Sequence, residues 1–221
     1  MLASDGMARS RQTVPLPRNP VLYEAAQLQE IFRARYQHVL TFLGFGELGY
    51  ENTTQFAAIV ETELKTFHRR RCVVNTATLV TQGFERGVAD VYEIAHGMGL
   101  KTTGLFPRIA LETPERYSLS AFVDDTYFVD DHTWGGYLGE TTTPSNMLHA
   151  LTAVTDEVIA IGGGKHTAQE IREMLKQGKP VRYHSLGMNQ AVSVRWYGEQ
   201  NQPVPDPRGE AFRFWNANGR V

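Results

Sequence analysis

The sequence predicts an α/β protein with a Rossmann-like, three-layer, doubly wound fold and a mostly parallel sheet. Short apolar runs flanked by turn residues alternate with longer amphipathic stretches, which is the pattern of βα units laid into such a sheet. Residues 158–161 are apolar at every position, as expected for a strand that a parallel sheet buries on both faces. The 221 residues suffice to bury the core of one domain without disulfide support.

Six strands and five helices follow from this alternation. The strands are expected at residues 39–43, 72–75, 102–106, 126–129, 157–161 and 181–184. The helices are expected at residues 21–35, 53–68, 84–98, 145–154 and 167–177. In an open parallel sheet, ligands bind outside the carboxyl ends of the strands, so the turns that follow the strands are the places to look for a site.

The chain is expected to consist of one Rossmann-like domain, residues 21–197, and two tails. Residues 1–20 contain three prolines, each of which removes a backbone donor, and are predicted to form a disordered or extended tail. Residues 198–221 are also rich in proline but end in a group of aromatic residues. We expect that group to dock on this core or on a neighbouring chain, because burial of aromatic rings is favourable. Met7 follows a stretch of small residues, which makes it a second candidate for the natural start, with residues 1–6 added in front.

The charge balance and the cysteine content argue against several classes of function. The 22 basic and 24 acidic side chains give a net charge of −2, so no general attraction to nucleic acid or to an anionic membrane is expected. The single cysteine, Cys72, excludes an internal disulfide and favours a cytoplasmic location. No apolar run approaches the roughly 20 residues of a membrane helix, and no Cys/His cluster has the spacing of a zinc site. We therefore expect neither a membrane or nucleic-acid partner nor a bound metal.

The first candidate turn, residues 44–49, matches the pattern G-x-G-x-x-G between an expected strand and an expected helix. Its glycines would let backbone amides approach a phosphate, and Gly44, Gly46 and Glu47 are the candidate contacts. A nicotinamide dinucleotide site also requires an acidic residue at the end of the second strand, where this chain has Asn75. An NAD(P)-dependent oxidoreductase and a turn of structural use only both remain open.

The second candidate turn combines three glycines with a lysine, a histidine and a threonine. These residues are Gly162, Gly163, Gly164, Lys165, His166 and Thr167. Consecutive glycines can expose successive N–H groups, and the positive end of the following helix attracts an anion, so we expect a phosphate cradle. The alternative is a capping box, in which Thr167 and Glu170 satisfy the helix's own amides. Capping accounts for that pair but not for the glycines or Lys165.

Further candidate contacts follow neighbouring strands. Gly83 lies in the turn before the third helix and is a candidate to face a phosphate. Trp134 and Tyr137 lie on a glycine-rich loop from which they could stack on a base, or only pack. Asn146 is a candidate ribose contact, although Ser145 as an ordinary helix N-cap also explains this segment.

Two segments of the chain resemble the LOG-like Rossmannoid proteins, many of which carry the name lysine decarboxylase. Residues 81–107, with glycines at 83, 87, 99 and 104 and a proline at 107, resemble the second βα unit of that family. Residues 156–170 resemble its P-G-G-x-G-T-x-x-E motif. Gly162 stands where the family has proline, and His166 stands where it has the glycine directly before the threonine. The wider group, called SLOG, includes nucleoside-5′-monophosphate phosphoribohydrolases, molybdenum-cofactor carrier proteins and other nucleotide-binding domains.

The resemblance implies a small-molecule nucleotide as the ligand, no required cofactor, and a homodimer. It assigns Gly163, Gly164 and Thr167 to the phosphate cradle and Glu170 to the ribose, where it would be the catalytic residue of an N-glycosidase. The phosphoribohydrolases carry a catalytic arginine in the helix before the last motif, whereas residues 146–150 contain none. Two functions therefore remain open, a phosphoribohydrolase and a non-catalytic carrier or sensor.

Overall fold

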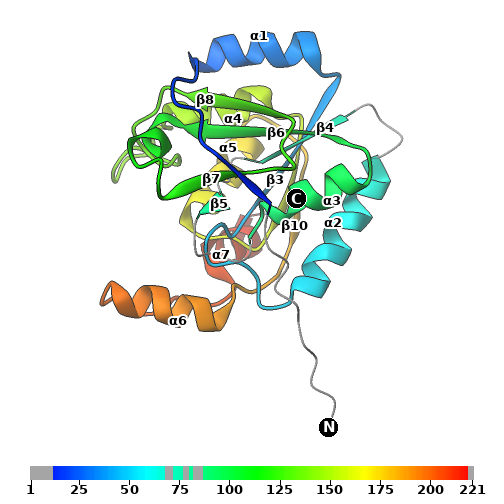
Figure 1. Ribbon diagram of the computed structural model, residues 1–221. Coiled ribbons are helices and arrows are strands. Elements are labelled where there is room, and N and C mark those ends of the chain that lie inside the picture. Colours follow the sequence, from blue (N-terminus) through cyan, green and yellow to red (C-terminus); the bar gives the residue numbers. More distant parts are fainter. Residues whose placement is uncertain (1–11, 68–71, 77–79, 82–86, 219–221) are drawn as a thin grey trace.

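The computed structural model describes residues 12–67, 72–76, 80–81 and 87–218 (Figure 1). In this part of the chain, seven parallel strands form the main sheet, in the order β10-β9-β3-β4-β6-β8-β2. Their bounds are β2 (Leu22–Tyr23), β3 (His38–Gly44), β4 (Cys72–Thr76), β6 (Lys101–Pro107), β8 (Asp125–Val129), β9 (Glu157–Ile161) and β10 (Val181–His184). All six predicted strands are present, and β2 is an addition at the edge.

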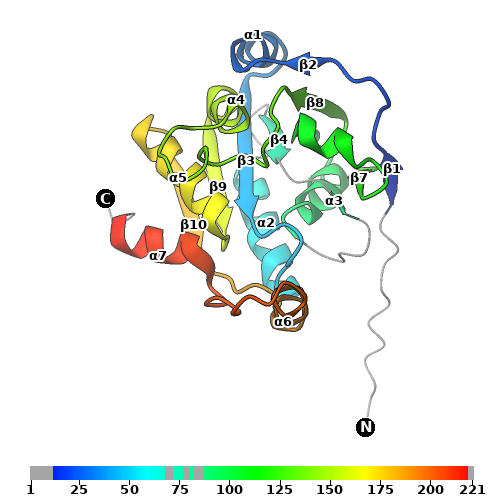
Figure 2. The same cartoon turned by 90° about the vertical axis from the view of Figure 1, so that its left-hand side faces the viewer.

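Helices cover both faces of the sheet (Figure 2). The helices are α1 (Ala25–Arg35), α2 (Thr53–Phe67), α3 (Asp90–Gly97), α4 (Asn146–Val154), α5 (Lys165–Lys176), α6 (Gln190–Glu199) and α7 (Gly209–Asn218), with a short 3₁₀ helix at Arg108–Glu112. Alternate residues of β3 point to opposite faces. Leu40 and Phe42 join the core beneath α2 and α3, whereas Val39 and Leu43 join the core beneath α1, α4 and α5. This arrangement confirms the Rossmann-like three-layer fold.

Three helices start two or more residues away from their predicted starts, and α4 starts one residue later than predicted. The helix expected from residue 21 begins at Ala25, because residues 22–23 pair with β8 and the Glu24 amide donates to the Gln27 side chain (2.9 Å). The helix expected from residue 84 begins at Asp90, and residues 82–86 lie outside the described residues. The helix expected from residue 167 begins two residues earlier, at Lys165.

A second, antiparallel sheet lies beside the main one. It has the order β1-β7-β5 and consists of β1 (Thr13–Pro15), β7 (Tyr117–Ser120) and β5 (Val80–Thr81). Within the segment expected to be a disordered or extended tail, β1 is extended and paired with β7. Leu16, next to it, is buried with Phe106 and Phe128. So short a strand has no periodicity of its own, and its partner lies far along the chain.

The predicted carboxyl-terminal tail is helical. α6 crosses the expected domain boundary at residue 197, and α7 packs along α5. Trp215 stacks on Tyr183 of β10 with ring centroids 5.6 Å apart, and the Arg172 guanidinium lies 5.1 Å from the Phe214 ring centroid. The aromatic group therefore packs against this chain's own β10 and α5.

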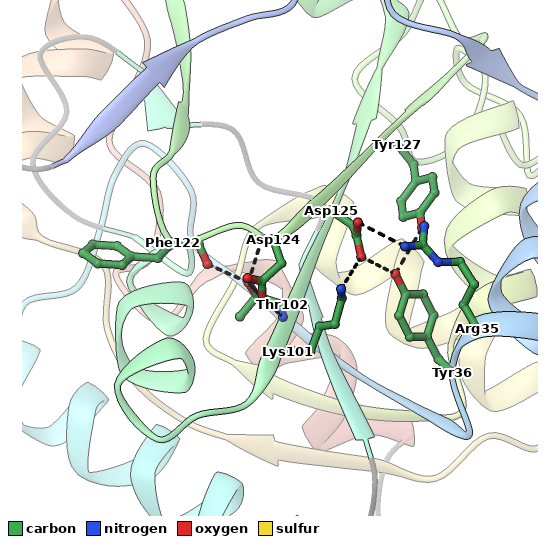
Figure 3. A network of polar contacts seen from close by, with 8 residues as sticks. All are labelled: Arg35, Tyr36, Lys101, Thr102, Phe122, Asp124, Asp125 and Tyr127. Atoms are coloured by element: carbon green, nitrogen blue, oxygen red, sulfur yellow. Dashed lines mark hydrogen bonds and ion pairs between the residues drawn. The ribbon is translucent and has the colours of Figure 1, made fainter.

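A polar network fixes the end of α1 to the amino ends of β6 and β8 (Figure 3). Arg35 donates to the Tyr127 hydroxyl (2.7 Å), and Tyr36 donates to Asp125 (2.8 Å), which also pairs with Lys101 (3.0 Å). The network lies at the opposite end of the strands from the glycine-rich turns. Tyr36 of this network lies two residues before His38, where β3 begins. None of the helices in the described ranges has the length and apolarity that crossing a membrane requires.

Candidate functional site

The order of the strands reverses between β3 and β9. From β3 the chain builds the sheet outward through β4, β6 and β8, and then returns to add β9 and β10 on the other side of β3 (Figure 2). Segments leaving the carboxyl ends of two such strands diverge, and this reversal point is where open α/β sheets bind ligands. The two glycine-rich turns predicted as sites, residues 44–49 and 162–167, follow these two strands.

Direct contacts join the two turns. The Thr167 hydroxyl donates to the Gly44 carbonyl (3.2 Å), and the buried Tyr50 hydroxyl donates to the Ile161 carbonyl (2.9 Å). The Val88 amide donates to the Phe45 carbonyl (2.8 Å), which brings the start of the α3 segment to the same place. The structure thus brings together the predicted residues of the first and second turns. Gly83 lies outside the described residues.

Five successive amides at the start of α5 have no partner among the described residues. The Gly162 amide donates to the His184 carbonyl (2.9 Å), and the Ala168 amide donates to the Gly164 carbonyl (3.0 Å). Between them, no group of the described residues accepts a hydrogen bond from the amides of Gly163, Gly164, Lys165, His166 or Thr167. The first-turn amides of a helix point out of its amino end, where the helix dipole is positive. This is the arrangement that binds a phosphate or carboxylate.

The contact between α7 and Gly163 fixes the direction of one of these amides. The Gly163 carbonyl accepts a hydrogen bond from the Ala211 amide (3.1 Å). No peptide bond of the described residues is cis, so the N–H of Gly164 points away from that carbonyl, and hence away from α7. The N–H of Gly164 is therefore directed to the side of this peptide that is opposite α7.

The capping-box alternative is wrong. Gly164 is the N-cap of α5 and provides no side chain, and Thr167 is the third helical residue, with its hydroxyl already bonded to Gly44. Glu170 lies in the second turn and makes no hydrogen bond or ion pair with any described residue. The helix begins at Lys165, two residues before Thr167. The capping-box pattern placed the start at Thr167 because it considers side chains only.

Glu170 is partly buried, and its carboxyl group is unusually basic. Desolvation raises the pKa of Glu170 to about 7. Both protonation states are therefore populated near neutral pH, which is the condition for a group that donates or accepts a proton during a reaction. Part of the residue remains exposed to solvent.

The glycine-rich loop after β8 lies against the first turn of α5. A Cβ atom placed on Gly136 would lie 2.8 Å from Cδ2 of His166, and the Tyr137 amide donates to the Gln169 side chain (3.1 Å). Desolvation and the neighbouring Lys165 lower the pKa of His166, so its imidazole is neutral at pH 7. His166 would therefore contribute its neutral ring, and no positive charge, to the phosphate site.

The three predicted base and ribose contacts differ in their surroundings. The Tyr137 hydroxyl donates to Glu173, and the Asn146 side chain donates to the Asp130 carbonyl (2.9 Å), so both polar groups are engaged within the protein. Ser145 caps α4, as its alternative interpretation required, by accepting from the Leu148 amide (3.2 Å). Trp134 is 43% exposed and is the one of the three with a free ring surface.

A group of residues that sequence reasoning missed surrounds Glu47. Desolvation raises the pKa of Glu47, while the charge of Arg116 and a hydrogen bond from Trp196 oppose the shift. Tyr117 lies within electrostatic range of Glu47, and its ring is 4.9 Å from that of Trp134, tilted by 53°. Tyr117 lies in β7, which Arg116 directly precedes, and Trp196 lies in α6. Neither element was predicted, and no local pattern marks these residues. Within the described residues, no three His, Cys, Asp or Glu side chains gather in a way that could hold a metal ion.

Comparison with known proteins finds similar solved structures at low sequence identity. No family model and no curated protein matches the chain. A structural genomics target named TM1055 is 18% identical, with 66% of this chain and 72% of that chain covered and a TM-score of 0.45. The molybdenum cofactor carrier protein of Chlamydomonas reinhardtii is 17% identical, with 82% and 96% covered and a TM-score of 0.44. A second structure of that carrier protein is 18% identical, with 83% of this chain and 99% of that chain covered and a TM-score of 0.45. At these identities the similarity concerns the fold.

Proposed function

We propose that this protein binds the phosphate of a nucleotide, or of a nucleotide-derived molecule, at the amides of residues 163–167. The observation that carries the proposal is the run of five unpartnered amides at the point where the strand order reverses. A helix leaves the amides of its N-cap and first turn unpaired by geometry, here those of residues 164–167, and the amide of Gly163 extends the run by one. Bound anionic oxygens would satisfy these donors and interact favourably with the helix dipole.

The side chains around the amides suit a phosphate more than a neutral ligand. Lys165 is exposed at the first helical position and can add its charge. The Thr167 hydroxyl is occupied by the Gly44 carbonyl, so Thr167 would contribute its amide. Glu170 is about one helical turn beyond Thr167, and the family resemblance assigns it to the ribose.

If the protein turns its ligand over, the reaction we expect is hydrolysis of an N-glycosidic bond. The C1′–N bond breaks, a C1′–O bond forms with water, and the proton of that water ends on the departing base. Glu170 would be the catalytic residue, with its ionised form either stabilising the positive charge that develops on the ribose or accepting the proton of the water. A pKa of about 7 suits either role.

A non-catalytic carrier or sensor is the second candidate function. The observation that favours it lies in α4, where residues 146–150 are Asn-Met-Leu-His-Ala and offer no arginine to the site. Met147, Leu148 and Ala150 of this helix are buried in the core, so its first turn is used for packing. The cradle then holds the ligand without chemistry on it.

One experiment tests both functions. The protein is incubated with nucleoside monophosphates, NAD and ADP-ribose in turn, while free base is measured by chromatography and unfolding by thermal shift. A ligand at 100 times its dissociation constant raises the free energy of unfolding by about 2.7 kcal/mol, which is a readily measured shift. Release of base identifies an enzyme, and a shift without release identifies a binder. The proposal is contradicted if none of these compounds releases base and none of them shifts the unfolding temperature.

A further inference from the structure

We propose that Glu47 and Trp134 form a subsite that selects a base presenting a ring N–H and an amino group side by side, as guanine does. This inference rests on the proposed function, because it places the base of the same ligand whose phosphate lies at residues 163–167. It goes further in naming the class of base and the residues that choose it.

The first observation is the position of Glu47 and Trp134 relative to the cradle. Glu47 follows Gly44 by three residues, and the Gly44 carbonyl contacts the Thr167 hydroxyl at 3.2 Å. Trp134 precedes Gly136 by two residues, and Gly136 abuts the His166 ring. Since a residue spans at most about 3.6 Å, both side chains start within about 11 Å of a residue that touches the cradle. The inference places the base of a nucleoside monophosphate, bound there by its phosphate, between these two segments.

The second observation is the unused hydrogen-bonding capacity of Glu47. Its carboxylate is half-buried and accepts one hydrogen bond, from the indole of Trp196. Arg116 acts on it through its charge, but no ion pair within 4.0 Å joins Glu47 to any described residue. An ionised carboxylate has about four acceptor positions, so several remain for a ligand. Guanine presents two parallel donors to such a group, whereas adenine presents one donor beside an acceptor.

The third observation is the ring surface next to the carboxylate. Trp134 is 43% exposed, and it leans on the buried Tyr117, whose hydroxyl lies within electrostatic range of Glu47. An exposed indole supported from behind by a second ring is a surface on which a base can stack. Glu47, Tyr117, Trp134 and Trp196 come from four separate segments of the chain, so the fold, and not local sequence, assembles them.

The central experiment compares GMP and AMP by titration calorimetry with the full chain. We expect GMP to bind at least about tenfold more tightly than AMP. Adenine would make one hydrogen bond fewer to Glu47 and would place an acceptor against the carboxylate, and this weakens binding by about tenfold or more. The variant Glu47→Gln retains an acceptor for Trp196 but pairs with adenine, as glutamine does in base recognition, so it should reverse the preference. The control Glu51→Gln changes an exposed carboxylate of the same loop, which accepts from the Gln190 amide (2.8 Å), and should leave the ratio unchanged.

A second pair of variants tests the stacking surface. Trp134→Ala should weaken GMP binding by about tenfold, in the range measured for loss of a base-stacking ring. Leu138→Ala removes a side chain of the same loop with a similar exposed fraction, 42%, and should have no effect on GMP binding. A loss in both variants would indicate a general loosening of the loop and would contradict the stacking role.

The outcomes separate this inference from the proposed function. Equal binding of GMP and AMP that Glu47→Gln does not change overturns the subsite and leaves the phosphate site standing. Absence of binding by every nucleotide overturns the proposed function and the inference with it. The same N–H and amino edge occurs in pterins, so neopterin triphosphate is included as a probe. Tighter binding of this probe than of GMP, lost in Glu47→Gln, supports the recognition of the edge and identifies a pterin as its source.

Discussion

At the residue scale, the three consecutive glycines serve different purposes. Gly162 and Gly163 have φ values of +57° and +116°, and a Cβ on Gly163 would lie 2.5 Å from the Thr167 side chain. Both therefore need to be glycine for the turn to form. Gly164 has φ −91°, and a Cβ there would meet no atom within 4 Å. At Gly164 the backbone allows other residues, and the space beside it is open.

This difference allows a direct test of the phosphate site at Gly164. Gly164→Asp places a carboxylate at the N-cap of α5, where it can bond to the first-turn amides in place of a ligand. Folding should be unchanged or more stable by a few tenths of a kcal/mol, while the thermal shift produced by nucleotides is lost. Gly164→Ala is the matched control and should retain most of the shift. A ligand shift that persists in Gly164→Asp would place the anion elsewhere.

Glu170 predicts how stability depends on pH. Its pKa rises from 4.5 in the unfolded chain to about 7 in the fold, so the folded state holds a proton that the unfolded state has released between these values. The free energy of unfolding therefore falls as the pH rises from 4.5 to 7, by up to about 3 kcal/mol. Glu170→Gln removes this cost, and in urea unfolding it should be more stable than the native chain at pH 8 but not at pH 4.5.

Glu173, on the same helix, is the control for this measurement. Burial favours its neutral form, but hydrogen bonds from Lys176 and Tyr137 outweigh burial and lower its pKa. Its contribution is complete above pH 4.5 and is lost only at lower pH. Glu173→Gln should therefore destabilise the protein equally at pH 5 and pH 8. If Glu170→Gln behaved in the same way, Glu170 would not be the desolvated carboxyl described here.

At the element scale, the junction of α5 and α7 links folding to the site. Gly209, the first residue of α7, has φ +77°, and a Cβ on it would lie 2.1 Å from the Gly163 carbonyl oxygen. Two backbone segments approach closely here, and only glycine permits it. The docking of α7 is thus a condition for the conformation of the Gly163 peptide.

The variant Gly209→Ala tests this junction. Gly178 is a matched control, because it has a similar φ of +68° but no atom within 4 Å of an added Cβ. Gly178→Ala should cost about 1 kcal/mol from backbone strain alone. Gly209→Ala should cost a further 1–3 kcal/mol or so, because a backbone atom must move, and should also weaken nucleotide binding. Equal effects of the two variants on urea unfolding and on nucleotide affinity would contradict the role given to the junction.

At the scale of the whole molecule, the predictable part of the fold is the part that short segments encode. The run at 157–161 is apolar throughout and the helix at 53–67 is amphipathic, so each is recognisable without its neighbours. β1, β7 and α7 were missed because their stability comes from partners distant in sequence. The same limit applies to the site, where the glycines mark the cradle locally but Arg116 and Trp196 reach Glu47 only through the tertiary fold.

The expected homodimer stays a prediction. The aromatic group near the carboxyl terminus no longer argues for it, since Trp215 and Phe214 pack against this chain's own β10 and α5. Light scattering of the purified protein would give a mass of 24.8 kDa for a monomer and twice that for a dimer.

The hydrogen bond from the Ala211 amide to the Gly163 carbonyl makes the last helix of the chain a reporter of events on the other side of one peptide group. An anion that accepts from the Gly164 amide polarises that peptide, and its carbonyl oxygen becomes a stronger acceptor toward Ala211. Occupancy of the cradle should then slow hydrogen–deuterium exchange at Ala211, a position that no ligand touches.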